Sequence, residues 1–267
     1  MTTVVTRARL DAELVRRGLA RSRQQAVELI AQGRVVVRGV PAGKPATVVD
    51  RDTPLVVHEP AERAWASRGS RKLIGALDAF GVDPAGLRCL DAGASTGGFT
   101  DVLLARGAAC VIAADVGYGQ LVWRLRNDPR VLVHDRTNVR RLQPELIGGL
   151  VDLTVADLSF ISLRTVLPAL AACTRADGAL LPMVKPQFEV GRDRLGAGGV
   201  VREQELRRAA LVGVANAARA LGLRLLGAVA SLLPGPSGNV EFFLHLRRDG
   251  PEVGDEVLAA AVEAGPG

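Results

Sequence analysis

The chain has few of the side chains that usually bind metals or form disulfides. Its 267 residues include only three cysteines and three histidines, widely separated along the sequence: Cys89, Cys110 and Cys173, and His58, His134 and His245. Three cysteines inside apolar runs indicate reduced thiols rather than a disulfide framework, and neither residue type shows the spacing of metal ligands. We therefore expect a cytoplasmic protein with no metal site.

Long apolar runs and aromatic side chains are also scarce. No segment approaches the roughly 20 apolar residues that a membrane-spanning helix needs, and the opening "MTTVVTRARLDAELVRR" lacks the apolar core of a secretory signal. Aromatic residues make up 3% of the chain, too few to anchor a basic amphipathic helix in a membrane surface. The composition therefore argues against a membrane partner.

Lysine is rare as well, although the chain is basic. Only Lys44, Lys72 and Lys185 occur among the 34 basic residues, so arginine supplies nearly all of the positive charge. A lysine ammonium is compact and can lose its proton, whereas an arginine guanidinium stays charged. A lysine in this chain therefore hints at a position where such an ammonium is needed.

The positive charge is concentrated near the amino terminus. Residues 1–38 hold eight arginines against three acids, an excess of five within a total net charge of +6. Such a concentration favours a surface that binds a polyanion. The alternative is the solvated face of an arginine-rich helix.

Residues 1–58 are predicted to form a small α+β domain. Two segments, 9–18 and 22–33, have apolar residues at helical spacing and end on glycine, so they are predicted to be helices. Two short apolar runs, 34–39 and 54–57, are predicted to be strands. The spacing "RLD..L...G.A.SR..A...I..G.V.V.G" resembles a small RNA-binding domain first named for a small-subunit ribosomal protein. The resemblance implies RNA contacts from the second helix and the turn before it, here from Arg7, Arg9, Arg21, Arg23 and Arg34.

Residues 59–69 are predicted to be a linker, and 70–249 a second domain in which helical and strand patterns alternate. Helices are expected at 71–81 and 203–222. Seven strands are expected, at 88–93, 109–116, 130–135, 151–160, 178–188, 224–233 and 240–248. The last two are joined by the tight loop "PGPSGN" and should be antiparallel. The predicted class is α/β, with a seven-stranded Rossmann-like sheet. The tail, 250–267, is rich in Ala, Gly and Glu, and we expect it to be partly disordered.

The glycine-rich stretch "DAGASTGG" indicates which cofactor this sheet binds. It follows the first strand but lacks the GxGxxG of a dinucleotide site, and it opens on Asp91, which would repel a pyrophosphate. A carboxylate suits the cationic amino-acid end of S-adenosylmethionine, while Asp115 and Asp135, at the next two strand ends, suit its ribose and adenine. The alternative is that Asp91 merely caps a turn. The predicted cofactor residues are Asp91, Gly93, Ser95, Thr96, Gly97, Gly98, Phe99, Asp115, Val116, Asp135 and Asp157.

The methyl acceptor is predicted from residues that other methyltransferases need and this chain lacks. Methyltransferases that act on amino groups tend to have prolines in the loop after the fourth strand, but here this loop reads "DLSFIS" and has none. Methylation of a pyrimidine carbon needs a cysteine nucleophile there, and the loop has no cysteine. A ribose hydroxyl needs a group that takes its proton. Four residues are expected to converge on one sheet edge and could provide this group, namely Lys72, Asp157, Lys185 and Glu241. Separately, each has a structural alternative as a turn cap, surface lysine or salt-bridge partner.

Residues 66–247 resemble the ribose 2′-O-methyltransferases of FtsJ type. The motifs are "SRGSRKL", "CLDAGASTGGFT", "ADVGYGQL", "VADLSFISL", "VKPQFEVG" and "LPGPSGNVEFF". The resemblance implies a Lys-Asp-Lys-Glu catalytic tetrad at Lys72, Asp157, Lys185 and Glu241.

With its amino-terminal domain, the chain as a whole resembles the TlyA family of actinobacteria, often labelled haemolysins. This implies 2′-O-methylation of cytidines in rRNA, within both ribosomal subunits, and a link to capreomycin susceptibility. Two alternatives remain: a non-catalytic RNA-binding assembly factor that keeps the fold, and a membrane-lytic haemolysin.

Overall fold

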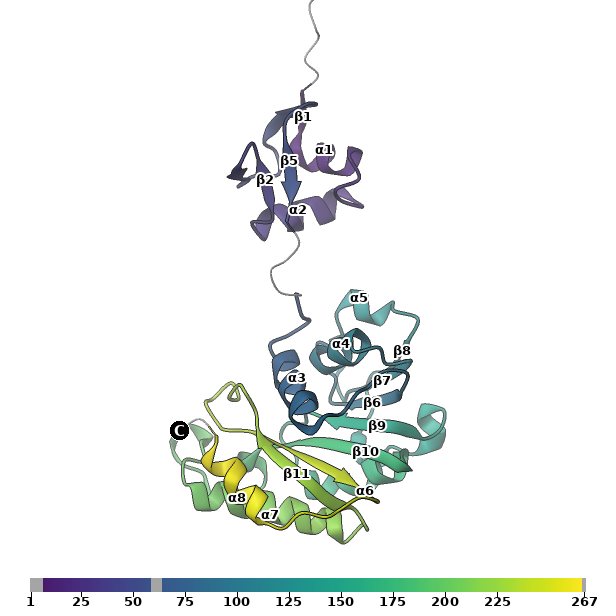
Figure 1. Ribbon diagram of the computed structural model, residues 1–267, viewed down its shortest axis with the longest axis vertical. Coiled ribbons are helices and arrows are strands. Elements are labelled where there is room, and N and C mark those ends of the chain that lie inside the picture. Colours follow the sequence, from purple (N-terminus) through teal and green to yellow (C-terminus); the bar gives the residue numbers. More distant parts are fainter. Residues whose placement is uncertain (1–6, 59–63, 266–267) are drawn as a thin grey trace, which may run out of the picture. The chain divides into compact units, whose positions relative to one another are not determined.

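The protein is described by a computed structural model that covers residues 7–58 and 64–265, without the side chain of Arg192 (Figure 1). The chain divides into two compact units, Met1–Ala64 and Trp65–Gly267. The first five residues of the predicted linker, 59–63, lie outside the described residues. Trp65 packs against the hydrophobic core of the second unit.

The first unit is a small α+β fold. Its helices are α1 (Leu10–Arg16) and α2 (Arg23–Ala31), and its strands form a pair, β1 (Arg7–Arg9) with β4 (Val48–Asp50), and a three-stranded sheet of β3 (Val40–Pro41), β2 (Val35–Val37) and β5 (Leu55–Val57). All pairings are antiparallel. The two predicted helices and both predicted strands are therefore confirmed.

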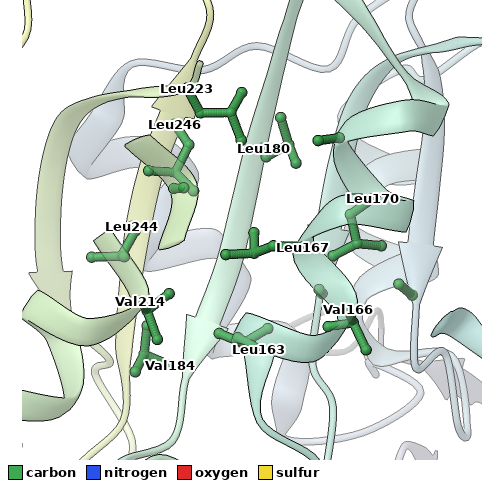
Figure 2. Packing of buried hydrophobic residues seen from close by; sticks show 14 of the residues in the cluster. Leu163, Val166, Leu167, Leu170, Leu180, Val184, Val214, Leu223, Leu244 and Leu246 are labelled. Atoms are coloured by element: carbon green, nitrogen blue, oxygen red, sulfur yellow. The ribbon is translucent and has the colours of Figure 1, made fainter. Parts of the chain in front are cut away.

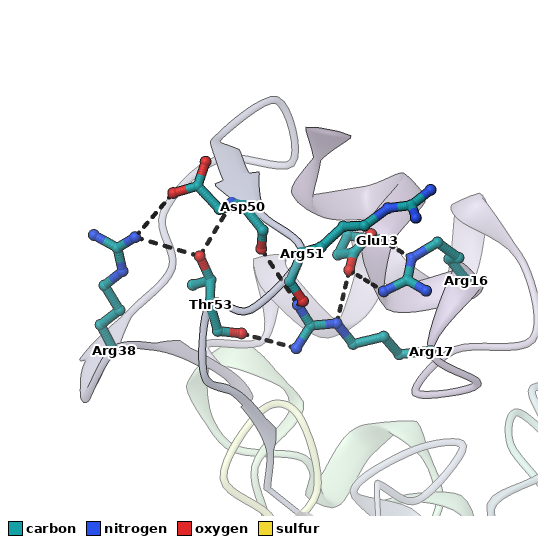
Figure 3. A network of polar contacts seen from close by, with 7 residues as sticks. All are labelled: Glu13, Arg16, Arg17, Arg38, Asp50, Arg51 and Thr53. Atoms are coloured by element: carbon teal, nitrogen blue, oxygen red, sulfur yellow. Dashed lines mark hydrogen bonds and ion pairs between the residues drawn. The ribbon is translucent and has the colours of Figure 1, made fainter. Parts of the chain in front are cut away.

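A polar network joins α1 to the turn between β4 and β5 (Figure 3). The Nε of Arg17 donates to Glu13, 2.7 Å away, and its two terminal nitrogens donate to backbone carbonyls, including that of Thr53 at 2.8 Å. Arg16 also contacts Glu13. These guanidiniums hold the pKa of the buried Glu13 carboxyl down at about 2, with Arg16 the larger cause. Part of the amino-terminal arginine excess is thus structural.

The second unit is built on a seven-stranded sheet with the order β11-β12-β10-β9-β6-β7-β8. Its strands are β6 (Arg88–Ala92), β7 (Cys110–Ala114), β8 (Val131–His134), β9 (Val151–Ala156), β10 (Thr174–Val184), β11 (Arg224–Ala230) and β12 (Phe242–Arg247). The five strands from β8 across to β10 are parallel to one another, and β12 is antiparallel to both of its neighbours. The predicted sheet is confirmed, including the antiparallel final pair.

Helices cover both faces of this sheet because successive side chains of its strands point to opposite faces and are apolar on both. Leu180 and Val184 of β10 pack in one core with α6 (Leu163–Cys173), α7 (Gln204–Arg219) and β12, as Figure 2 shows. Leu181 and Met183 belong to the other core, formed with α3 (Gly69–Phe80), α4 (Gly98–Ala105) and α5 (Trp123–Arg126). The unit is a three-layer α/β/α sandwich.

The carboxyl-terminal tail is ordered where we expected disorder. Residues Glu256–Glu263 form α8, which lies beside β11 in Figure 1 and buries Leu258, Ala261 and Val262 in the sheet's core. Alanine favours helices, and these three residues share one helical face. The prediction of a partly disordered tail is therefore wrong over α8, because the Ala and Glu content reflected an amphipathic helix.

The two cores suggest a matched test on two phenylalanines. Phe243 of β12 is fully buried, 5.9 Å from the ring of Phe99, whereas the side chain of Phe160 is 91% exposed. We expect Phe243→Ala to lower the free energy of unfolding by about 3–5 kcal/mol, and Phe160→Ala to change it by less than about 0.5 kcal/mol. Urea denaturation followed by circular dichroism measures both, and equal losses would contradict this assignment of the core.

Candidate active site

The predicted acids and lysines lie at one edge of the sheet. Asp115, Asp135 and Asp157 directly follow β7, β8 and β9, and Lys185 directly follows β10. Glu241 directly precedes the antiparallel β12, so it lies at the same edge. The carboxyl edge of a parallel sheet is where ligands bind in open α/β folds.

Two lysine–carboxylate ion pairs form at this edge. The Nζ of Lys72, from α3, contacts Glu241 Oε2, and the Nζ of Lys185 lies 2.6 Å from Asp157 Oδ1. Three of the four side chains are more than nine-tenths buried, while that of Asp157 is 25% exposed. The structure therefore brings the four candidate residues together as two pairs.

Both ion pairs line one cavity of about 330 Å³. The glycine-rich loop forms part of its wall, and a second cavity of about 610 Å³ adjoins it. Ser159, Lys185 and Glu241 line both cavities. The site thus has one chamber against the glycine loop and a larger one beyond the charged pairs.

The glycines of the loop allow very close packing. Gly93 has a φ of +88°, and a Cβ there would lie 2.4 Å from the carbonyl oxygen of Asp157. A Cβ on Gly98 would lie 2.3 Å from Ser67 Oγ. The loop residues Gly93, Ser95, Thr96, Gly98 and Phe99 all line the smaller cavity, whereas Gly97 turns the chain into α4 at a φ of +100°.

Asp91 lies fully buried beneath this loop. Its Oδ2 accepts hydrogen bonds from the Thr100 backbone N–H at 2.8 Å and hydroxyl at 2.6 Å, while Oδ1 has no partner among the described residues. Burial raises the pKa of Asp91 to about 7, and the nearby charges of Asp157 and Asp115 add to this rise. An unpaired buried carboxylate oxygen has the charge that a cationic ligand group needs. Asp91 lines neither cavity, however, so its contact with the amino-acid end of S-adenosylmethionine stays a prediction.

The other acids have different surroundings. Asp115 accepts hydrogen bonds from the backbone N–H groups of Ser95 at 2.8 Å and Gly117 at 2.7 Å, and so ties two loops together. Asp135, which we expected to bind adenine, is paired with Arg126 at 2.6 Å. Val116, the remaining candidate, is 75% exposed. None of Asp115, Val116 and Asp135 lines the smaller cavity.

Sequence patterns missed two residues, Ser159 and Phe160, that line the larger cavity together with Lys185. The hydroxyl of Ser159 accepts a hydrogen bond from Lys185 Nζ at 2.9 Å. Phe160, next in the chain, has a φ of +63° and lies 5.3 Å from the ring of Phe188, which also lines the larger cavity. A strained, exposed phenylalanine at a site edge is unusual. The sequence "DLSF" does not predict either contact, because both depend on how the chain turns at Phe160.

Three of the five candidate RNA-binding arginines, Arg7, Arg9 and Arg23, lie beside acids that orient them. Arg9 and Arg23 share the buried Asp11, whose pKa they lower to about 2, yet their side chains remain 52% and 60% exposed. Arg7 lies 3.4 Å from Asp50, and Arg34 donates to a backbone carbonyl. Arg21 is exposed. Four of the five are exposed and Arg34 is half-buried, and their contact with RNA stays a prediction.

Neither a metal cluster nor a membrane-spanning helix occurs in residues 7–58 and 64–265. No group of three His, Cys, Asp or Glu side chains in these ranges could hold a metal ion. Each helix in the same ranges is too short or too polar to span a bilayer.

Comparison with known proteins identifies the family. Residues 65–248 match the family described as FtsJ-like methyltransferase, and residues 8–53 match the S4 domain. The chain is 65% identical over 241 residues to a Mycobacterium tuberculosis protein named 16S/23S rRNA (cytidine-2′-O)-methyltransferase TlyA, covering 90% of each. The chain belongs to the TlyA family of FtsJ-like methyltransferases. The predicted family, the methyltransferase activity and the RNA-binding domain are thereby confirmed.

Other relatives carry a different name over the same architecture. Hemolysin A of Brachyspira hyodysenteriae is 35% identical over 239 residues, covering 89% of this chain and 98% of that protein. A solved structure of a candidate hemolysin from Streptococcus thermophilus is 38% identical, covers 97% of both chains and has a TM-score of 0.71. The fold of this chain is therefore one that has been solved in a relative.

The buried Asp91 carboxyl generates a test that separates folding from cofactor binding. The pKa of Asp91 is about 7 in the folded protein, above its ordinary value of 3.8. The contribution of Asp91 to stability is therefore fully present below pH 3.8 and is lost as the pH rises through 7. In Asp91→Asn the amide oxygen still accepts from Thr100 and no charge is buried. We expect the variant to melt at a higher temperature than the wild type at pH 8, with a smaller difference at pH 5.

The same variant should bind S-adenosylmethionine more weakly. A hydrogen bond to a charged group contributes about 1.5–3 kcal/mol, which corresponds to roughly 10- to 100-fold in affinity. Calorimetric titration of both proteins with S-adenosylmethionine measures the change. Equal affinities would show that Asp91 does not contact the cofactor.

Proposed function

We propose that the chain transfers a methyl group from S-adenosylmethionine to the ribose 2′-hydroxyl of cytidines in rRNA. The observation that carries this proposal is the pair of buried lysine–carboxylate contacts, Lys72 with Glu241 and Lys185 with Asp157, lining one cavity beside the glycine loop. When bound there, S-adenosylmethionine supplies an electrophilic methyl group on a sulfonium. The loop and Asp91 would hold its amino-acid end.

In this proposal the four residues handle the proton of a weakly acidic hydroxyl. Lys185 first releases the proton of its ammonium to solvent, and the resulting amine takes the hydroxyl proton while the oxygen–methyl bond forms and the carbon–sulfur bond breaks. Asp157 orients the amine and stabilises the ammonium that results. Lys72 and Glu241 fix the opposite wall and hold the hydroxyl in line with the methyl group. The near-complete burial of three of these side chains keeps water from competing.

The larger cavity suits an unstacked nucleoside. Phe160 presents an almost fully exposed ring at its edge, and Phe188 lies beside it. Proteins commonly bind single bases by stacking them on aromatic rings, a contact that contributes about 1–3 kcal/mol per base. We propose that the target cytidine leaves its helix and stacks on Phe160, with its ribose near Lys185.

The S4 domain supplies the second part of substrate binding. Its candidate arginines Arg7, Arg9, Arg21, Arg23 and Arg34 would contact phosphates of rRNA within the ribosomal subunits. The name of the Mycobacterium tuberculosis relative, which gives both 16S and 23S rRNA, supports targets in both subunits. A non-catalytic assembly factor would not need two buried ion pairs at a cofactor edge. The name of the Brachyspira relative, Hemolysin A, would suggest a lytic role instead. An enzyme that methylates rRNA in the cytoplasm does not need such a role.

Lys185→Ala tests the proposed base. We expect methylation of unmodified ribosomal subunits to fall about 10²- to 10⁴-fold, the usual contribution of a general base. The affinity for S-adenosylmethionine should stay within about threefold. Lys44→Ala, which removes an exposed lysine of the first unit, is the matched control and should keep wild-type activity. Transfer of labelled methyl groups, followed by mapping to the nucleoside, measures both; label on a base, or activity surviving in Lys185→Ala, would refute the mechanism.

Two arginines of the first unit separate RNA binding from folding. Arg21→Ala should weaken rRNA binding and reduce the slope of log affinity against log salt by about one, because one phosphate contact is lost. It should leave the melting temperature unchanged. Arg17→Ala removes contacts to Glu13 and three backbone carbonyls, and should instead lower the free energy of unfolding by about 1–3 kcal/mol. Filter binding across a salt series and thermal melting distinguish the two effects.

A further inference from the structure

We propose that Ser159 is a positioning residue that aims the amine of Lys185 at the acceptor hydroxyl. Ser159 lies on the segment between β9 and α6, two residues after Asp157 and directly before Phe160. Its Oγ lies 2.9 Å from Lys185 Nζ, and it is exposed on the wall of both cavities. The inference rests on the proposed function, in which Lys185 takes the proton.

The number of hydrogens on the amine explains why a second partner matters. A neutral lysine amine has two N–H groups and one lone pair in a tetrahedral arrangement. Asp157 Oδ1 and Ser159 Oγ, at 2.6 and 2.9 Å, accept one N–H each. The lone pair then has a single remaining direction. After the transfer, the proton from the acceptor hydroxyl becomes the third N–H of the ammonium, and the other two contacts stay in place.

Asp157 alone would not fix this direction. Lysine has a flexible four-carbon stem, and a single ion pair leaves the amine free to rotate about its Cε–Nζ bond. With only one contact, the lone pair would point toward the acceptor for a fraction of the time. A second acceptor at a fixed angle removes this rotation before the substrate arrives, which lowers the barrier to the proton transfer.

The position of Ser159 is itself held by its neighbours. Phe160 adopts a left-handed backbone conformation at a φ of +63°, so the chain turns sharply just after the serine. On the other side of this turn, Ser162 Oγ and the Leu163 N–H both donate to the buried Glu189, at 2.6 Å each. Glu189 follows β10 closely, as Lys185 does. The turn is therefore fastened to the strand end that carries the lysine.

A set of near-isosteric variants tests the hydroxyl. Ser159→Ala removes the acceptor, Ser159→Cys replaces it with a weak one of similar size, and Ser159→Thr keeps it. With ribosomal subunits and labelled S-adenosylmethionine, we expect kcat to fall about 10- to 100-fold in the alanine and cysteine variants, because the amine becomes positively charged as it takes the proton and a hydrogen bond to a charged group contributes that much. The threonine variant should stay within about threefold of wild type. KM for both substrates should change by less than about twofold.

The lysine background shows whether the serine acts through Lys185. Adding Ser159→Ala to Lys185→Ala should produce no further loss, because the group that it orients is gone. A wild-type kcat in Ser159→Ala, a change confined to KM, a threonine variant as slow as alanine, or additive losses in the double variant would each overturn the role of Ser159. If Lys185→Ala itself keeps activity, the proposed base fails instead, so the two failures are distinguishable.

Discussion

The site depends on the close contact between the glycine loop and the end of β9. The Asp157 N–H donates to the Ala92 carbonyl at 3.0 Å, which continues the pairing of β6 with β9 beyond the last residue of β9. Gly93 can pass beside it only because it has no side chain. This contact fixes the distance between the candidate cofactor loop and the candidate catalytic carboxylate, and the remaining site residues are added to that pair.

Sequence patterns predicted most of this architecture. Strand patterns that alternate with helical patterns indicated the seven strands. Because Asp157, Lys185 and Glu241 lie next to strand ends, the same patterns placed these three residues at one edge of the sheet. The same patterns did not predict which lysine pairs with which carboxylate, because that depends on how α3 packs against the sheet. This limit applies equally to the pairing of Asp135 with Arg126, because the loop and strand β8 that separate them follow a path that no local pattern encodes.

The errors share a physical origin. The Ala, Gly and Glu content of the tail suggested disorder. Helix α8 forms nevertheless, because burial of its apolar face on the sheet stabilises it. Ser159 was overlooked because its role arises from the turn at Phe160 and from the anchoring of that turn by Glu189. Both cases concern tertiary contacts that override or supplement what a short stretch of sequence indicates.

The order of the strands has a consequence for when the site is completed during synthesis. Lys72 is made early, but its partner Glu241 lies 169 residues later, at the start of the strand that inserts between β10 and β11. A nascent chain that has not yet folded β12 therefore holds an unpaired lysine and an open sheet edge. Because domains acquire their long-range pairings last, the complete set of charged residues forms only when nearly the whole chain has left the ribosome, the very particle that it is proposed to modify.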